Sequence, residues 1–205
     1  MNLGPRTDRL SPIRIPTHRR VAVKSRLVAL LVSVSLVSAV QAWATVLPDA
    51  CGDDKVKFDV STQKAQPAPA PPVAGKAQIV FIETMDEENL AFCKDCDVVA
   101  RLGLDGAWVG ANKGNSYFAY TVEPGEHHLC TNWDSPRAFL SQKVGVADFT
   151  AEPGKTYYFQ ARFLIKMVDI DTAQLEQRLD LTQLSDDEGK YQVKISALST
   201  GTPKK

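Results

Sequence analysis

The stretch that decides the fold is VVARLGLDGAWVG, residues 98–110. Its first seven residues, 98–104, are typical of a β-strand, and Asp105-Gly106 is a strong signal for a two-residue hairpin turn. A second strand starts at Ala107. The stretch therefore predicts β-strands joined by a tight turn.

The same pattern continues on both sides of this stretch. Period-two segments predict further strands at 77–83, 117–122, 127–133, 144–150 and 156–165. Pro124-Gly125 and Pro153-Gly154 have the residues that a type II turn requires, and we expect each turn to join two paired strands. Short strands separated by turns at this spacing predict an all-β fold, a small antiparallel β-sandwich.

A short C-terminal helix is expected after the capping box at residues 185–188. Apolar side chains follow at helical spacing, at Tyr191, Ile195 and Leu198. Gly189 weakens this helical pattern, and a strand through residues 191–195 is the alternative. Residues 166–184 fit either a strand or a helix.

The N-terminus has the three parts of a secretory signal peptide. Residues 1–26 contain seven basic side chains and one acidic side chain, and residues 27–40 contain no charge. Ala42-Trp43-Ala44 then forms an A-x-A cleavage site. The apolar stretch is shorter than the ~20 residues that span a bilayer. We therefore interpret residues 1–44 as a signal peptide cleaved after Ala44, with an uncleaved membrane anchor as the alternative.

Two variants of export stay open. Arg19-Arg20 resembles the pair of a twin-arginine signal, although its flanking residues differ from that signal. Cys51 follows Ala50, as a lipidated cysteine would, but Asp49 and Pro48 do not fit a lipoprotein motif. We expect membrane contact only through the signal segment or through a lipidated Cys51.

Removal of the leader changes the charge of the chain. The whole chain is neutral, with 24 basic and 24 acidic side chains, whereas the part after Ala44 has a net charge of −6. Binding to a phosphate backbone requires clustered Lys and Arg. We therefore expect no nucleic-acid partner.

Three regions follow the predicted signal peptide. Residues 45–75 are interpreted as an extended arm, because its centre at 64–72 is rich in Pro and Ala. Residues 76–198 form the predicted β-sandwich domain, and residues 199–205 are interpreted as a polar tail.

All four cysteines lie after the predicted leader, and an even number in an exported chain indicates disulfides. We favour the pairs Cys93–Cys96 and Cys51–Cys130, the second of which would attach the arm to the domain. Cys93–Cys130 is the main rival pairing.

Two stretches, residues 99–110 and 122–129, resemble the PEGA pattern. This pattern has a strand that ends in Asp-Gly, then Val-Gly, and later Pro-Gly-x-His with an apolar residue after it. The chain resembles PEGA-like bacterial envelope proteins of unknown function more closely than it resembles the general PEGA pattern. This resemblance covers roughly residues 76–165. The resemblance implies a small β-sandwich in the cell envelope and carries no catalytic residues.

The Cys93-x-x-Cys96 motif is the basis of the rival hypothesis, a redox or metal-handling protein. A metal site would join these cysteines to His127 or His128. Adjacent histidines on a strand point to opposite faces, and exported thiols tend to oxidise before they bind metal. We therefore interpret the motif as a structural disulfide.

Aromatic side chains on the strands suggest a candidate binding surface at Trp108, Tyr117 and Trp133, with core packing as the alternative. Alternation places Tyr117 opposite Phe118, so we expect Tyr117 to face outward. The sequence predicts no catalytic residue, cofactor or metal site. We interpret the chain as a non-enzymatic module, in the periplasm or cell envelope or secreted, that contacts envelope proteins or cell-wall glycan.

Overall fold

The computed structural model describes residues 47–64, 68–85, 98–135, 143–169 and 174–204. The predicted signal peptide and the pair Cys93 and Cys96 lie outside these ranges. In the described part of the chain, no helix is long and apolar enough to cross a membrane.

The described residues form ten strands and one helix. They are β1 (Phe58–Gln63), β2 (Ala77–Thr84), β3 (Val99–Leu104), β4 (Ala107–Asn112), β5 (Ser116–Val122), β6 (Gly125–Asp134), β7 (Val144–Ala151), β8 (Thr156–Asp169), β9 (Gln174–Leu184), α3 (Asp186–Ile195) and β10 (Ala197–Pro203).

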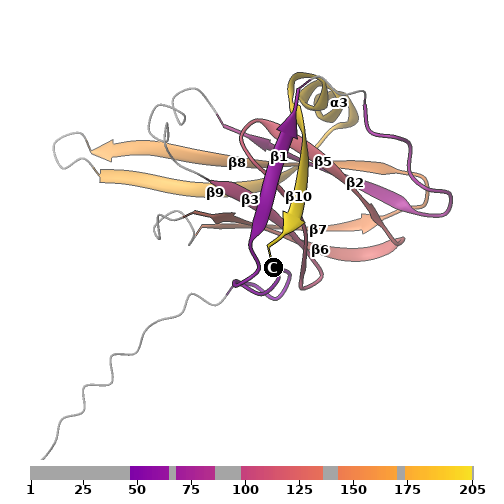
Figure 1. Cartoon of the computed structure of the whole chain (residues 1–205), viewed down its shortest axis with the longest axis horizontal. Helices are drawn as coiled ribbons and strands as arrows, with labels where there is room; N and C mark the ends of the chain where they lie inside the picture. Colours follow the sequence, from indigo (N-terminus) through magenta and orange to yellow (C-terminus); the bar gives the residue numbers. More distant parts are fainter. Residues whose placement is uncertain (1–46, 65–67, 86–97, 136–142, 170–173, 205) are drawn as a thin grey trace, which may run out of the picture. The chain divides into compact units, whose positions relative to one another are not determined.

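Two β-sheets pack face to face, which confirms the predicted all-β sandwich with a short C-terminal helix (Figure 1). The six-stranded sheet has the order β1-β10-β5-β2-β8-β9, and the four-stranded sheet has the order β4-β3-β6-β7. Neighbouring strands are mainly antiparallel. The pairs β2–β8 and β5–β10 are parallel, a feature that the sequence did not indicate.

Strand β2 lies at the centre of the packing. Ile79 and Phe81 belong to the large apolar cluster between the two sheets. Val80 and Ile82 belong to a smaller cluster with Val193 of α3, on the outer face of the six-stranded sheet. Because β2 is buried on both faces, its central residues 79–82 are continuously apolar rather than alternating.

The predicted hairpin turn at Asp105-Gly106 is confirmed. Both residues have positive φ, +50° and +89°, and Leu104 pairs with Ala107 across the turn. Positive φ at both central positions is the type I′ geometry that favours Asp-Gly.

The two Pro-Gly turns do not join paired strands, so this prediction is wrong. The Pro124-Gly125 corner leads from β5 in the six-stranded sheet to β6 in the four-stranded sheet, and Pro153-Gly154 leads back from β7 to β8. The second turn has the predicted type II form: its glycine has φ +78°, and the Lys155 N–H donates to the Glu152 carbonyl at 3.2 Å. A Pro-Gly turn fixes the local bend, whereas side-chain burial decides which sheet the next strand joins.

Helix α3 begins at the predicted capping box. The Ser185 side chain accepts from the Glu188 N–H, and the Glu188 carboxylate accepts from the Ser185 N–H at 3.1 Å. The helix ends at Ile195, so the alternative strand through residues 191–195 is not formed. Leu198, assigned to the helix by its spacing, lies in β10 instead.

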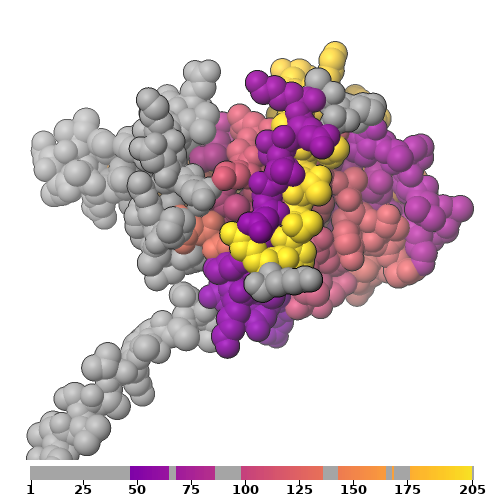
Figure 2. Space-filling view, viewed as in Figure 1, coloured from indigo at the N-terminus to yellow at the C-terminus, as the bar shows by residue number. Residues whose placement is uncertain are grey.

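Strands β1 and β10 correct the predicted domain boundaries. The first lies within the expected arm, residues 45–75, and the second contains most of the expected tail, residues 199–205. They pair antiparallel from Phe58 opposite Pro203 to Gln63 opposite Leu198. Figures 1 and 2 show them side by side, β1 in indigo and β10 in yellow.

The sequence did not predict these two strands, because most side chains of β1 are polar and exposed and β10 consists mainly of small and polar residues. Hydrophobic periodicity gives no signal for such a pair, which is held by backbone hydrogen bonds. One side chain adds a contact to the other sheet, since the buried Ser199 hydroxyl donates to the Ala111 carbonyl at 3.0 Å.

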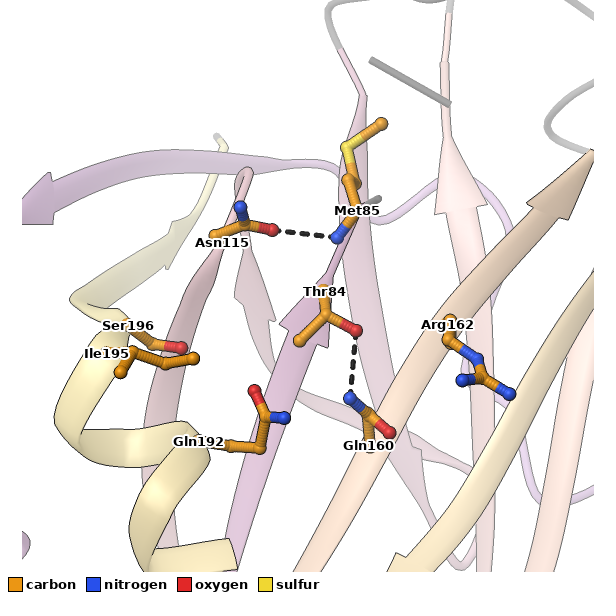
Figure 3. A pocket seen from close by; sticks show the side chains of 8 residues that line it. All are labelled: Thr84, Met85, Asn115, Gln160, Arg162, Gln192, Ile195 and Ser196. Carbon is orange, nitrogen blue, oxygen red and sulfur yellow. Dashed lines mark hydrogen bonds between the residues drawn. The ribbon is translucent and has the colours of Figure 1, made fainter. Parts of the chain in front are cut away.

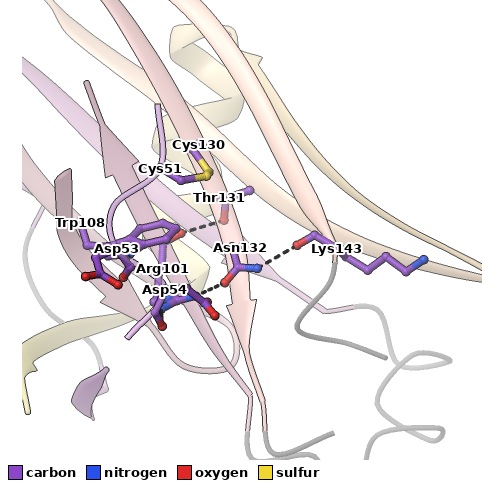
Figure 4. Close-up of a disulfide and its surroundings, with 9 residues drawn as sticks. All are labelled: Cys51, Asp53, Asp54, Arg101, Trp108, Cys130, Thr131, Asn132 and Lys143. Atoms are coloured by element: carbon purple, nitrogen blue, oxygen red, sulfur yellow. Dashed lines mark hydrogen bonds and ion pairs between the residues drawn. A yellow bond between two sulfur atoms is a disulfide. The ribbon is translucent and has the colours of Figure 1, made fainter. Parts of the chain in front are cut away.

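Residues 47–57, which we call the N-terminal segment, cover the outer face of the four-stranded sheet. A disulfide joins Cys51 to Cys130 of β6, with Cα atoms 5.1 Å apart (Figure 4). This is the pairing that the sequence favoured for these two cysteines. It closes a loop with a sequence separation of 79 residues, which is worth about 4.5 kcal/mol in the chain-entropy model.

Arg101 of β3 is the second attachment of the N-terminal segment. Its side chain is 1% exposed and donates to the carbonyl oxygens of Asp54 (3.2 Å) and Val56 (2.7 Å). It also contacts the Asp54 carboxylate at 3.1 Å and the Asn132 side-chain oxygen. The buried guanidinium therefore has acceptors from both the segment and the sheet.

Candidate functional site

The aromatic surface predicted at Trp108, Tyr117 and Trp133 is not formed. Trp133 is fully buried between the sheets, with its ring centroid 4.0 Å from that of Phe163. Tyr117 alternates away from Phe118 as expected, but the apolar cluster beneath α3 covers it, and only 1% of it is exposed. The prediction failed because alternation assigns a side chain to a face and does not tell whether another element covers that face.

Trp108 is half-buried and holds the N-terminal segment. Its indole N–H donates to the Asp53 carbonyl at 2.8 Å (Figure 4). The guanidinium carbon of Arg101 lies 4.3 Å from the ring centre, within the range of a cation–π contact. Its ring is thus engaged in internal packing.

The two histidines of the metal hypothesis contact aspartates. The His127 Nδ1 atom lies 2.7 Å from Asp105 Oδ2, and the His128 Nδ1 atom lies 2.7 Å from Asp148 Oδ1. Among the described residues, no group of three or more His, Cys, Asp or Glu side chains is placed to hold a metal ion. The proposed partners at 93 and 96 lie outside those residues.

The strongest candidate site is a polar pocket of about 290 Å³ on the outer face of the six-stranded sheet (Figure 3). Strands β2 and β8 form its floor, and the C-terminal part of α3 forms one wall. We call it the amide pocket. It is lined by Thr84, Met85, Asn115, Gln160, Arg162, Gln192, Ile195 and Ser196.

Internal hydrogen bonds orient two of its three carboxamides. The Asn115 side-chain oxygen accepts from the Met85 N–H at 2.7 Å, which leaves the NH₂ group to donate to a ligand. The Gln160 NH₂ group donates to the Thr84 hydroxyl at 2.9 Å, which leaves its oxygen as an acceptor. The third carboxamide, Gln192, reaches the pocket from α3 (Figure 3).

Arg162 gives the pocket a positive charge. It follows Gln160 on the outer face of β8, and in the described part of the chain it has no ion-pair partner. Its cross-strand neighbour Asp180 pairs instead with Arg178, at 2.8 Å from Nε to Oδ1. The Arg162 guanidinium is therefore placed to bind an anion, and its fork of N–H donors matches a carboxylate.

The remaining lining is small or apolar. Met85 is 8% exposed and Ile195 is 59% exposed, so the helix supplies most of the accessible apolar surface, and Ser196 adds a hydroxyl. The volume of about 290 Å³ lies just below the 300–1,000 Å³ that is typical of ligand sites. Such a pocket suits one sugar ring rather than a long chain.

The sequence contained part of the signal for this site. Tyr158, Gln160 and Arg162 alternate along one face of β8, and two polar side chains within the otherwise apolar and aromatic residues 157–165 mark an accessible face. The position of α3 over that face depends on tertiary packing. No local sequence pattern therefore indicated that Gln192 and Ser196 line the pocket.

Comparison of the chain with protein-family models, curated proteins and solved structures found no match. The resemblance to PEGA-like proteins therefore stays an expectation from turn motifs, and function is inferred from the amide pocket.

Proposed function

We propose that this chain is an exported, non-enzymatic module of the cell envelope that binds an acidic sugar of the cell wall in the amide pocket. The observation that carries the proposal is the Arg162 guanidinium, free of an acidic partner among the described residues, beside three carboxamides in a pocket of one-ring size.

A sugar ring presents hydroxyl groups that both donate and accept hydrogen bonds, and carboxamides offer both functions in return. Asn115 presents a donor and Gln160 an acceptor. Arg162 supplies paired donors for a carboxylate, which a neutral sugar lacks. Ile195 offers an apolar contact to the C–H face of the ring.

Three further observations support a setting outside the cytoplasm. The N-terminus has the parts of a signal peptide, and the Cys51–Cys130 disulfide is compatible with an oxidising compartment. The expected PEGA-like resemblance is to bacterial envelope proteins. Together they favour the periplasm, the cell envelope or secretion.

A matched pair of sugars tests the proposal. The precursor is expressed in a bacterial host, and the protein purified from the exported fraction is titrated with N-acetylmuramic acid and with N-acetylglucosamine, which lacks the lactyl carboxylate. We expect the acidic sugar to bind at least about tenfold tighter, because a hydrogen bond to a charged group contributes about 1.5–3 kcal/mol. Equal affinities would contradict the assignment.

A matched pair of variants locates the preference. Arg162→Gln should abolish the preference for the acidic sugar while leaving the fold intact. Lys204→Gln removes an exposed cation outside the amide pocket, one that pairs with Asp59, and should leave the preference unchanged. If Arg162→Gln kept it, the amide pocket would not be the site.

Thiol counting on the exported protein addresses the rival redox or metal hypothesis. We expect no free thiol, because Cys93 and Cys96 are interpreted as a structural disulfide. Two free or zinc-protected thiols at these positions would favour the rival instead.

A further inference from the structure

A second cavity lies on the other sheet, beside the Asp105 hairpin. It is an open cleft of about 600 Å³ between the N-terminal segment, the β3–β4 turn and strands β6 and β7. We call it the aspartate cleft. It is separate from the amide pocket, since the two share no lining residue.

The aspartate cleft has an apolar floor. Pro48, Ala50 and Val146 line it, and Val146 is 57% exposed. The exposed Val146 side chain offers contact to an aliphatic chain. The disulfide also fixes this floor, because Val146 lies directly opposite Cys130 in the β6–β7 pair.

Three carboxylates surround this floor, and they come from three different elements. Asp49 belongs to the N-terminal segment, Asp105 to the β3–β4 turn and Asp148 to β7. His127 and His128 offset part of this charge. Even with both histidines protonated, the three carboxylates leave the site net negative.

Two of the three carboxylates have oxygen atoms available for a ligand. The Asp148 Oδ1 atom accepts from His128, and within the described ranges its second oxygen and the Asp49 carboxylate have no hydrogen-bond partner. Both oxygens of Asp105 accept from the histidines, from the His127 ring and the His128 N–H. Burial raises the pKa of Asp105, but these hydrogen bonds more than offset that effect and lower it, so the carboxylate stays ionised at neutral pH.

We propose that the aspartate cleft is a docking site for a lysine side chain of a partner protein. The aliphatic stem of the lysine lies on the apolar floor and its ammonium group meets the carboxylates of Asp49 and Asp148. An ammonium group donates in three directions, which suits acceptors from separate elements, whereas a planar guanidinium is best matched by one carboxylate. The Cys51–Cys130 disulfide holds the N-terminal segment against β6 before binding, which reduces the entropy lost on docking.

Two peptides that differ only in charge test this proposal. The probes are acetyl-Leu-Lys-Leu-amide and the same peptide with its lysine acetylated, added to ¹⁵N-labelled protein from the exported fraction. We expect the charged peptide to shift the amide signals of Asp105, His128 and Val146, and to bind at least about tenfold tighter than the acetylated one. Equal affinities of the two peptides would overturn the proposal. The same holds if free ethanolamine, which has the ammonium group without the peptide, binds as tightly as the charged peptide.

Two variants assign the effect to the cleft. The double variant Asp49→Asn, Asp148→Asn changes exposed side chains and should remove the preference for the charged peptide. Asp59→Asn, whose carboxylate pairs with Lys204 on the β1–β10 ribbon, is the matched control and should keep it. A double variant that retains both its dispersed spectrum and its preference would rule out the aspartate cleft. These outcomes do not depend on whether the amide pocket binds a sugar.

Discussion

Replacement of Glu83 by glutamine should stabilise the protein at neutral pH and remove part of its pH dependence. Glu83 lies on β2 and is 1% exposed, and both of its carboxyl oxygens are buried without a hydrogen-bond partner. Burial raises the pKa of this carboxyl group well above its ordinary value. The folded protein therefore keeps Glu83 protonated to a higher pH than the unfolded chain does, in which it ionises above about pH 4.3.

The sign and slope of the effect follow from this difference in pKa. Because the folded pKa is the higher one, the contribution of Glu83 to stability is fully present below about pH 4.3 and is lost as the pH rises toward the folded pKa. Within that window the loss is about 1.4 kcal/mol per pH unit. Glutamine has the same size and does not titrate, so Glu83→Gln abolishes this loss.

Urea unfolding at half-unit steps from pH 5 to pH 8 measures the effect. The free energy of unfolding of Glu83→Gln, relative to the unmodified protein, should increase by about 1.4 kcal/mol per pH unit until the folded pKa is reached. Glu126→Gln, at an exposed position of β6, controls for the loss of a surface charge. Parallel pH profiles of the unmodified protein and Glu83→Gln would refute the buried, neutral carboxyl group.

Three further substitutions test the packing by the same unfolding assay. Cys130→Ser should lower the free energy of unfolding by about 4 kcal/mol through loss of the long disulfide loop, and an effect below about 1 kcal/mol would show that the loop closure contributes little. Gly189→Ala gains about 1 kcal/mol in helix propensity, but the added Cβ would overlap the Tyr158 ring. We therefore expect the free energy of unfolding to fall by about 1–3 kcal/mol. A net gain in stability would contradict this contact. Burial lowers the pKa of His127, but its hydrogen bonds to Asp105 and a backbone carbonyl more than offset this effect and raise the pKa. The contribution of His127 to the free energy of unfolding is therefore present below about pH 6.5 and is lost as the pH rises through the folded pKa. Asp105→Asn should therefore destabilise the protein more at pH 6 than at pH 9, and an equal loss at both would argue against the pair.

Much of the sandwich was predictable from local patterns. The apolar run of β2, the hairpin at Asp105-Gly106 and the capping box at Ser185 each have a local physical cause, and each appears where the sequence places it. The partners of the strands were not predictable in this way. Pro124-Gly125 and Pro153-Gly154 indicate turns, but a turn does not tell whether the chain stays in its sheet or crosses to the other.

The candidate sites were harder to predict than the strands. Tyr117 was correctly placed on the face opposite Phe118, yet the cluster beneath α3 buries it. Arg162 and Gln192 belong to elements far apart in the sequence, and they meet only because α3 packs on the outer face of β8. The aspartate cleft likewise depends on the Cys51–Cys130 disulfide, which brings the N-terminal segment against β6.

The most direct test of the amide pocket is a side-chain NMR titration with N-acetylmuramic acid. We predict that the NH₂ signals of Asn115, Gln160 and Gln192 and the Nε–H signal of Arg162 shift together, with one dissociation constant, while the Nε–H signal of Arg178 does not move. Shifts confined to other parts of the protein, or none at saturating sugar, would contradict the proposed function.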